Sequence, residues 1–194
     1  MKFVAIDYET ANASPQSACS FGMLVFDDGV LVHSYHTLLK PPRKYGRFLW
    51  GNQCIHHISP EMVEDAPNWK DAYSKIEPWL NEAIIIAHNA EFDMQVLVAL
   101  NNYYDLPIDF NYMCTVQISR VIHPQLLNHK LSTVSEYLSL DHQHHDALSD
   151  AYACSMIMVD AMVKTGIFDI HELAKSLNLR IKNVGEKEND NNIG

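Results

Sequence analysis

The feature that most constrains the fold is a change in the spacing of apolar residues along the chain. Up to residue 39 they come in short runs, Lys2–Asp7, Phe21–Phe26 and Val30–Leu39, which are typical of strands. Asp27-Asp28-Gly29 separates the last two runs, and an Asp-Gly pair in this place predicts a hairpin. From Trp69 onward helical spacing alternates with further apolar runs. The sequence therefore predicts an α/β fold with a mixed sheet flanked by helices.

Helical spacing recurs through the second half of the chain. In the first such segment, apolar residues from Trp69 to Leu80 fall on one helical face, and Pro78 is expected to kink the helix or end it early. The continuous apolar run Ala83–Ala87 predicts a central strand, and a short strand is expected near Phe110. The remaining predicted helices cover residues 92–100, 115–122, 131–138, 147–163 and 170–177.

The length of 194 residues predicts one domain, which we place at residues 1–179, with a polar and flexible C-terminal tail at 180–194. No apolar run approaches the roughly 18 residues of a membrane span, and Asp7 comes too early for a signal peptide. The chain has no CxxC pair, so its cysteines are expected to be buried thiols in a reducing compartment. They are Cys19, Cys54, Cys114 and Cys154. We therefore expect a cytoplasmic protein.

The net charge of −10 argues against a general nucleic-acid coat protein, but not against an enzyme that meets nucleic acid through metal ions. Residues 29–60 differ from the rest because they contain no acidic residue. Basic and aromatic residues are interleaved there: Lys40, Arg43, Lys44, Tyr45, Arg47, Phe48 and Trp50. This composition suits a single-stranded nucleic acid. A solvated loop with its aromatic rings in the core would show the same pattern, and both interpretations stay open.

Two carboxylates stand at the end of the first predicted strand. Asp7 and Glu9 are two residues apart, so their side chains point to the same face. Carboxylates side by side repel each other unless a cation lies between them. A polar strand end that enters solvent would give the same pattern, so the pair alone does not distinguish a cation site from a solvated end.

Further carboxylates stand where predicted helices begin. Asn89 is the expected N-cap of the helix that follows the central strand, and Asp93 lies near its first turn. Asp146 is expected to cap the long helix, with Asp150 one turn inside and His145 in the loop just before it. Acids favoured by the helix dipole, and a surface histidine, are the structural alternatives.

Taken together, these residues favour a metal-dependent phosphodiester hydrolase. Carboxylate oxygens are the ligands that Mg²⁺ and Mn²⁺ prefer. A pair of such ions can activate a water and hold the leaving oxygen of a phosphodiester. The ionised side chains of Asp7, Glu9, Asp93 and Asp150 would carry −4 and two divalent ions +4, so the cleft would accept a phosphate despite the overall acidity.

Three segments resemble, in order and spacing, the motifs of the DEDDh 3′→5′ exonucleases, a family with a ribonuclease H-like fold. They are Asp7-x-Glu9, His88-Asn89-Ala90-x-Phe92-Asp93 and His145-x-x-x-x-Asp150. The resemblance covers residues 3–157. It implies that the four carboxylates are metal ligands and that His145 is the general base acting on the attacking water. Many relatives have His-Gly-Ile where this chain has His56-His57-Ile58, so the loop near the substrate's 3′ end is expected to differ.

One further motif overlaps the start of the third segment. The run His142-Gln143-His144-His145-Asp146 resembles part of a zinc-hydrolase loop, but that signature needs a histidine at position 147, where the chain has Ala147. We therefore interpret His142 and His144 as loop residues.

The sequence thus predicts an enzyme that releases nucleoside 5′-monophosphates from 3′ ends with the help of two Mg²⁺ or Mn²⁺ ions, in DNA proofreading, repair or processing. The expected partners are a single-stranded 3′ end, of DNA or RNA, and a polymerase or repair complex. Two alternatives are an exoribonuclease that trims RNA 3′ ends and a non-catalytic module that binds 3′ ends. The oligomeric state is left open.

Overall fold

The predicted hairpin forms one edge of a six-stranded sheet in the computed structural model, which describes residues 2–184. β1 (Lys2–Thr10), β2 (Ala18–Asp27) and β3 (Val30–Leu38) are antiparallel neighbours. β4 (Ile84–Ala87) pairs in parallel with β1, β5 (Asn111–Cys114) pairs in parallel with β4, and β6 (Lys182–Asn183) is antiparallel to β5. The strand order is β3-β2-β1-β4-β5-β6. This confirms the predicted mixed sheet.

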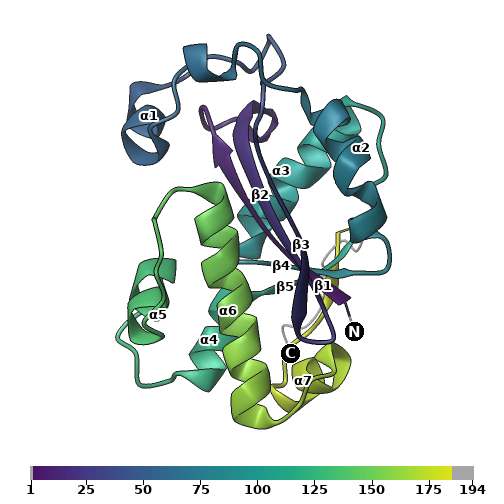
Figure 1. The fold of residues 1–194 in the computed structure, drawn as a ribbon, viewed down its shortest axis with the longest axis vertical. Helices are drawn as coiled ribbons and strands as arrows, with labels where there is room; N and C mark the ends of the chain where they lie inside the picture. The colour runs from purple at the N-terminus through teal and green to yellow at the C-terminus, as the bar shows by residue number, and fades with distance from the viewer. Residues whose placement is uncertain (1, 185–194) are drawn as a thin grey trace, which may run out of the picture.

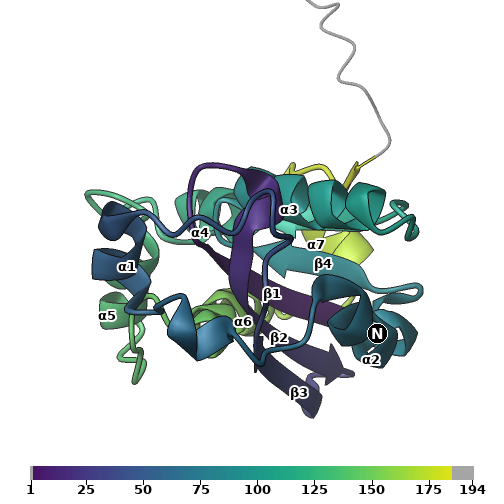
Figure 2. The ribbon, with the colours of Figure 1, turned by 90° about the horizontal axis from the view of Figure 1, so that it is seen from above.

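Helices cover both faces of the sheet (Figure 1). α2 (Trp69–Leu80) and α3 (Ala90–Tyr103) pack on one face. α4 (Thr115–Ile122), α5 (Leu131–Tyr137), α6 (Ala147–Thr165) and α7 (Ile170–Ser176) belong to the hydrophobic core on the other. Figure 2 shows α3 and α6 on opposite sides of β1. α1 (Trp50–His56) and two 3₁₀ turns, Pro15–Ser17 and Glu61–Val63, complete the described elements.

β1 is buried on both faces, and its alternation decides which face receives its carboxylates. Val4, Ile6 and Tyr8 belong to the core under α2 and α3, whereas Phe3 and Ala5 belong to the core under α6. Because side chains alternate along a strand, Asp7 and Glu9 continue the row of Phe3 and Ala5 on the α6 face. The hydrophobic pattern thus directs both carboxylates toward the start of α6.

The structure corrects several sequence predictions. The early end allowed for at Pro78 is wrong, because α2 continues for two residues beyond it, whereas the kink stays a prediction. α1 was not predicted, because its seven residues carry no clear apolar stripe. The domain boundary at residue 179 is too early, since Lys182 and Asn183 extend the sheet as β6 by pairing with Tyr112 and Asn111. The rest of the predicted tail, residues 185–194, lies outside the described residues.

Three of the four cysteines are buried, and one is exposed. Cys19, Cys114 and Cys154 are buried thiols as predicted, whereas Cys54 is exposed on α1, which makes that prediction wrong. α1 lies over the end of the sheet and not within it, so one of its faces meets solvent (Figure 1). Among residues 2–184, no helix combines the length and the apolar character that crossing a bilayer requires.

Candidate active site

The first two predicted motifs meet where β1 runs beyond its parallel neighbour. β4 pairs with β1 only as far as Ala5, so the backbone of β1 beyond that point needs another partner on this side. α3 begins directly after β4, and Oδ1 of Asp93 accepts a hydrogen bond from the backbone N–H of Tyr8 at 3.3 Å. Asp93 is only 1 % exposed. The helix start thereby holds a buried carboxylate beside Asp7.

Asn89 occupies the N-cap position of α3, but it does not cap the helix as predicted. Its backbone is in the left-handed conformation (φ 68°), and its side chain accepts no capping hydrogen bond. The residue therefore acts as a sharp turn between β4 and α3. This turn brings Asp93 back over the end of β1.

The third motif approaches β1 because a glycine leaves room for it. Gly22 is paired with Asp7 across the β1–β2 ladder. A Cβ atom on Gly22 would lie 2.2 Å from the carbonyl oxygen of Ala147, the first residue of α6. Asp146 caps this helix as predicted, by accepting a hydrogen bond from the backbone N–H of Ser149 at 2.9 Å. Asp150, one turn inside α6, is 6 % exposed.

The carboxylates of β1, α3 and α6 form one electrostatic cluster. Burial is the main cause that raises the pKa of Asp7 well above its usual value, and the charges of Asp93, Asp150 and Glu9 raise it further. Burial, and then the charge of Asp150, raises the pKa of Glu9 to about 8. The pKa of Asp93 is raised mainly by burial as well. Divalent cations would favour the ionised forms, so this donor set fits oxygen-binding metal ions.

His145 lies beside this cluster on the loop before α6. Its Nδ1 is 3.9 Å from Oε1 of Glu9, and its side chain is 52 % exposed. Its backbone is left-handed (φ 62°), and its backbone N–H donates to Oδ2 of Asp150 at 3.1 Å. The imidazole is therefore close to the carboxylates but is not hydrogen-bonded to them. A half-exposed ring on a loop can approach a bound substrate.

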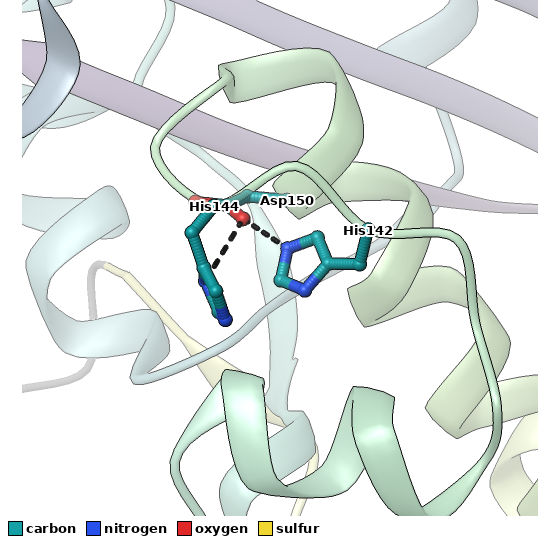
Figure 3. A group of neighbouring side chains, drawn as sticks. All are labelled: His142, His144 and Asp150. Atoms are coloured by element: carbon teal, nitrogen blue, oxygen red, sulfur yellow. Dashed lines mark hydrogen bonds and ion pairs between the residues drawn. The ribbon is translucent and has the colours of Figure 1, made fainter.

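Two histidines that were interpreted as plain loop residues also reach this site. Nε2 of His142 is hydrogen-bonded to Oδ1 of Asp150, and Nδ1 of His144 lies 3.9 Å from the same oxygen (Figure 3). Their place in the loop is as predicted, but their contact with Asp150 was missed. The three closely spaced histidines just before Asp150 are the sequence signal for this contact, although Ala147 breaks the zinc-hydrolase pattern.

His88, the first residue of the second motif, connects three segments of the chain by hydrogen bonds. Its ring bonds Oγ1 of Thr115 at 3.0 Å and the backbone carbonyl of His129 at 2.9 Å. Burial lowers the pKa of His88 to about 4, so the ring is neutral at physiological pH. It joins the end of β4 to α4 and to the loop before α5. The second motif thus combines His88, which supports the turn between β4 and α3, with Asp93, which lies in the carboxylate cluster.

The basic segment before α1 fits both interpretations of its composition in part. Some of its side chains are exposed, as a nucleic-acid contact would need, and one aromatic ring packs into a core. Lys40, Arg43, Lys44 and Arg47 are exposed, as is Trp50, at 79 %. Phe48 instead packs against Ala11, Cys19, Ile58 and Val63. The structure therefore exposes the four basic side chains and one indole ring to solvent, although Lys40 also donates a hydrogen bond to the carbonyl of Glu64 at 2.6 Å, while Phe48 packs into a core.

The unusual His56-His57 pair is accommodated without a glycine. His57 ends α1 in the left-handed conformation (φ 59°), which is the conformation that a glycine at this position would favour. His56 is buried, and its Nδ1 accepts a hydrogen bond from the backbone N–H of Ile58 at 3.0 Å. The left-handed turn at the end of α1 is thus made here by a histidine, in a conformation that strains a residue with a Cβ atom.

Comparison with known proteins identifies the family. The RNase_T family model, described as Exonuclease, matches residues 4–158, and the chain belongs to this family. It is 31 % identical over 180 residues to a PolC-type DNA polymerase III of Thermotoga maritima, covering 89 % of this chain and 13 % of that protein. It is 29 % identical over 169 residues to the 3′-5′ exonuclease DinG of Bacillus subtilis, covering 84 % of this chain and 18 % of DinG. The chain thus spans less than a fifth of these relatives.

The fold is also shared with solved exonucleases. Exonuclease X in complex with 5′ overhanging duplex DNA superposes with a TM-score of 0.71 at 23 % identity, over 90 % of this chain and 99 % of that one. A nuclease domain of the DEDDh family has the same fold. These matches confirm the predicted ribonuclease H-like fold, and the family match confirms the predicted exonuclease family, whose members are divalent-metal-dependent hydrolases.

Proposed function

We propose that this chain is a 3′→5′ exonuclease domain that removes nucleoside 5′-monophosphates from the 3′ ends of nucleic acid. The observation that carries the proposal is the convergence of Asp7, Glu9, Asp93 and Asp150, which come from three separate elements, with His145 at 3.9 Å from Glu9. Such an arrangement is electrostatically unfavourable in itself, and divalent cations would relieve it.

The four carboxylates would hold two divalent ions, Mg²⁺ or Mn²⁺. When bound, these ions would offset the charge of the phosphodiester and make the attacking water easier to deprotonate. His145 would accept the proton of that water, because a neutral imidazole is a proton acceptor and this one can move with its loop. Asp93 needs no such movement, since the Tyr8 N–H already fixes its orientation. The four carboxylates are thus held in place, and His145 approaches when the substrate binds.

We propose DNA as the preferred substrate and a polymerase or repair complex as the partner, because the relatives with the highest identity given above are a PolC-type DNA polymerase and a 3′-5′ exonuclease. The exposed cations around Trp50 would contact the single-stranded end. Cytoplasmic location is proposed because the four cysteines are free thiols, as a reducing compartment requires.

The test compares end-labelled single-stranded DNA, duplex DNA and RNA in Mg²⁺, in Mn²⁺ and in excess chelator. We expect stepwise loss of mononucleotides from the 3′ end, fastest on DNA, abolished by chelator and by a 3′-phosphate. Asp93→Asn serves as the inactive control. Cleavage of a covalently closed circle at the rate of a linear strand, or full activity in chelator, would contradict the proposal. Preferred degradation of RNA would favour the exoribonuclease alternative, and binding without hydrolysis would favour the non-catalytic module.

A further inference from the structure

The loop before α6 carries two histidines that the proposed reaction does not use, and they form a cluster with Asp150 of α6. His142 and His144 both direct a ring nitrogen to Oδ1 of Asp150 (Figure 3). One ligand atom from each of the three residues lies within 4.8 Å of the other two. The two rings pack edge to face, with their centroids 4.1 Å apart. The cluster therefore presents two imidazole nitrogens and one carboxylate oxygen to a common point.

The burial of His142 shows that the cluster is built into the fold. Its side chain is 3 % exposed, and its Nδ1 is buried without a hydrogen-bond partner among residues 2–184. A buried polar atom without a partner is destabilising, so the packing holds this ring against Asp150 at some cost. The side chain of His144 is 40 % exposed, so the cluster is open to solvent on that side.

The ligand types separate this cluster from the carboxylate site. Two imidazoles with one carboxylate form a ligand set of Zn²⁺, whereas Mg²⁺ prefers oxygen ligands alone. Bonds of about 2.0–2.1 Å place the ligand atoms of a tetrahedral zinc ion roughly 3.4 Å apart. An ion would replace the hydrogen bond between Nε2 of His142 and Oδ1 of Asp150, so these two atoms would move apart to that spacing while the exposed His144 ring moves closer to Oδ1. The open side would leave the fourth position to water.

We propose that His142, His144 and Asp150 form a binding site for a transition-metal ion of the Zn²⁺ class, and that occupancy of this site inhibits the exonuclease. The inhibition follows because Asp150 belongs to both sites. A carboxylate oriented toward the histidines is no longer available to the ions at Asp7, Glu9 and Asp93. This consequence rests on the proposed function, whereas the metal site itself does not.

The first experiment measures Zn²⁺ binding directly by calorimetry, on protein without a polyhistidine tag. It compares wild type with His144→Gln and with the double variant His142→Gln/His144→Gln. Co²⁺ titrations followed by visible absorption report nitrogen ligation in the same proteins. His171→Gln, which changes an exposed histidine of α7, is the matched control, and His145→Gln tests whether the neighbouring ring contributes.

We expect at least a tenfold weaker Zn²⁺ site in His144→Gln, loss of that site in the double variant, and wild-type binding in His171→Gln and His145→Gln. Because His144 is partly exposed, its single variant is informative even if the double variant fails to fold. Equal Zn²⁺ affinity in wild type and His144→Gln would overturn the proposal, as would the absence of micromolar binding in wild type.

The second experiment tests the inhibition by titrating Zn²⁺ into the DNA degradation assay at several Mg²⁺ concentrations. Each protein is normalised to its own rate in Mg²⁺ alone. We expect excess Mg²⁺ to relieve inhibition of wild type, and His144→Gln to need at least tenfold more Zn²⁺ for half inhibition. Unchanged inhibition of His144→Gln would refute the regulatory role. If wild type degrades nothing in Mg²⁺, the proposed function fails, while the calorimetric result on the metal site still stands.

Discussion

The carboxylates and the histidines of the site are held in contrasting ways. Asp7, Glu9, Asp93 and Asp150 all lie on regular strands or helices, and Asp93 is fixed by a backbone N–H. His145 lies on a loop in a left-handed conformation, half-exposed and 3.9 Å from its nearest carboxylate oxygen. In the proposed mechanism, the groups that hold the metal ions are therefore built on rigid elements, whereas the group that would move a proton is on a loop. The predictions below test this division.

The largest effect is expected from Asp93→Asn, which removes a charge from the rigid set while its amide oxygen can still accept the Tyr8 N–H bond. We expect turnover to fall by at least ~10³-fold, a loss of the order found when one group that stabilises transition-state charge is removed. Mn²⁺ affinity should fall in calorimetry, and thermal stability in chelator should not fall. Turnover within tenfold of wild type would exclude Asp93 as a metal ligand.

His145→Ala removes the movable group and should leave the rigid set intact. A lost general base costs ~10²–10⁴ in rate, so we expect a reduction of that size with Mn²⁺ affinity nearly unchanged. Single-turnover rates and metal titrations of both proteins provide the measurement. A variant that keeps wild-type turnover would show that His145 is not the base.

The stability of the metal-free protein should depend on pH through the rigid carboxylates. A carboxyl group whose pKa is higher in the folded state stabilises folding at low pH, and this contribution is lost as pH rises through the folded pKa. For Glu9, raised from 4.5 to about 8, the full loss amounts to roughly 5 kcal/mol at most. Denaturant unfolding in chelator should therefore show falling stability from pH 5 to 8. Added Mg²⁺ should stabilise more at pH 8 than at pH 5, and equal effects would contradict the electrostatic argument.

Gly22→Ala should disturb the approach of α6 to β1. The added Cβ would meet the Ala147 backbone at 2.2 Å, so the helix must shift. Overpacking of this kind costs typically ~1–3 kcal/mol, and displacement of Asp150 should reduce activity beyond the loss of stability. Gly51→Ala is the matched control, since its Cβ would meet nothing within 4 Å and alanine favours a helix. Chemical denaturation and turnover are measured for both, and similar effects in the two variants would refute the steric argument.

Local patterns in the sequence were enough to predict the layout of the fold and to propose the candidate site residues. Four of these patterns are short-range properties, which can be recognised without knowing which distant segments pack nearby. They are the alternation in β1, the Asp-Gly hairpin, the Asp146 cap and the helical spacing of α4 and α6. The same holds for the three motifs, because their carboxylates stand at element ends that an α/β fold brings to one edge of its sheet.

Contacts between distant residues were decided only by the tertiary structure. The strand β6 has only two residues and forms because the edge of β5 is available for pairing. No pattern within Lys182–Asn183 predicts a strand. Gly22 matters because α6 passes over it, more than a hundred residues later in the chain. The contact of His142 and His144 with Asp150 could not be predicted, because it depends on how the loop folds back over the start of α6. A side chain's partner depends on how helices and sheet pack, and packing is a property of the whole chain that short-range periodicity does not encode.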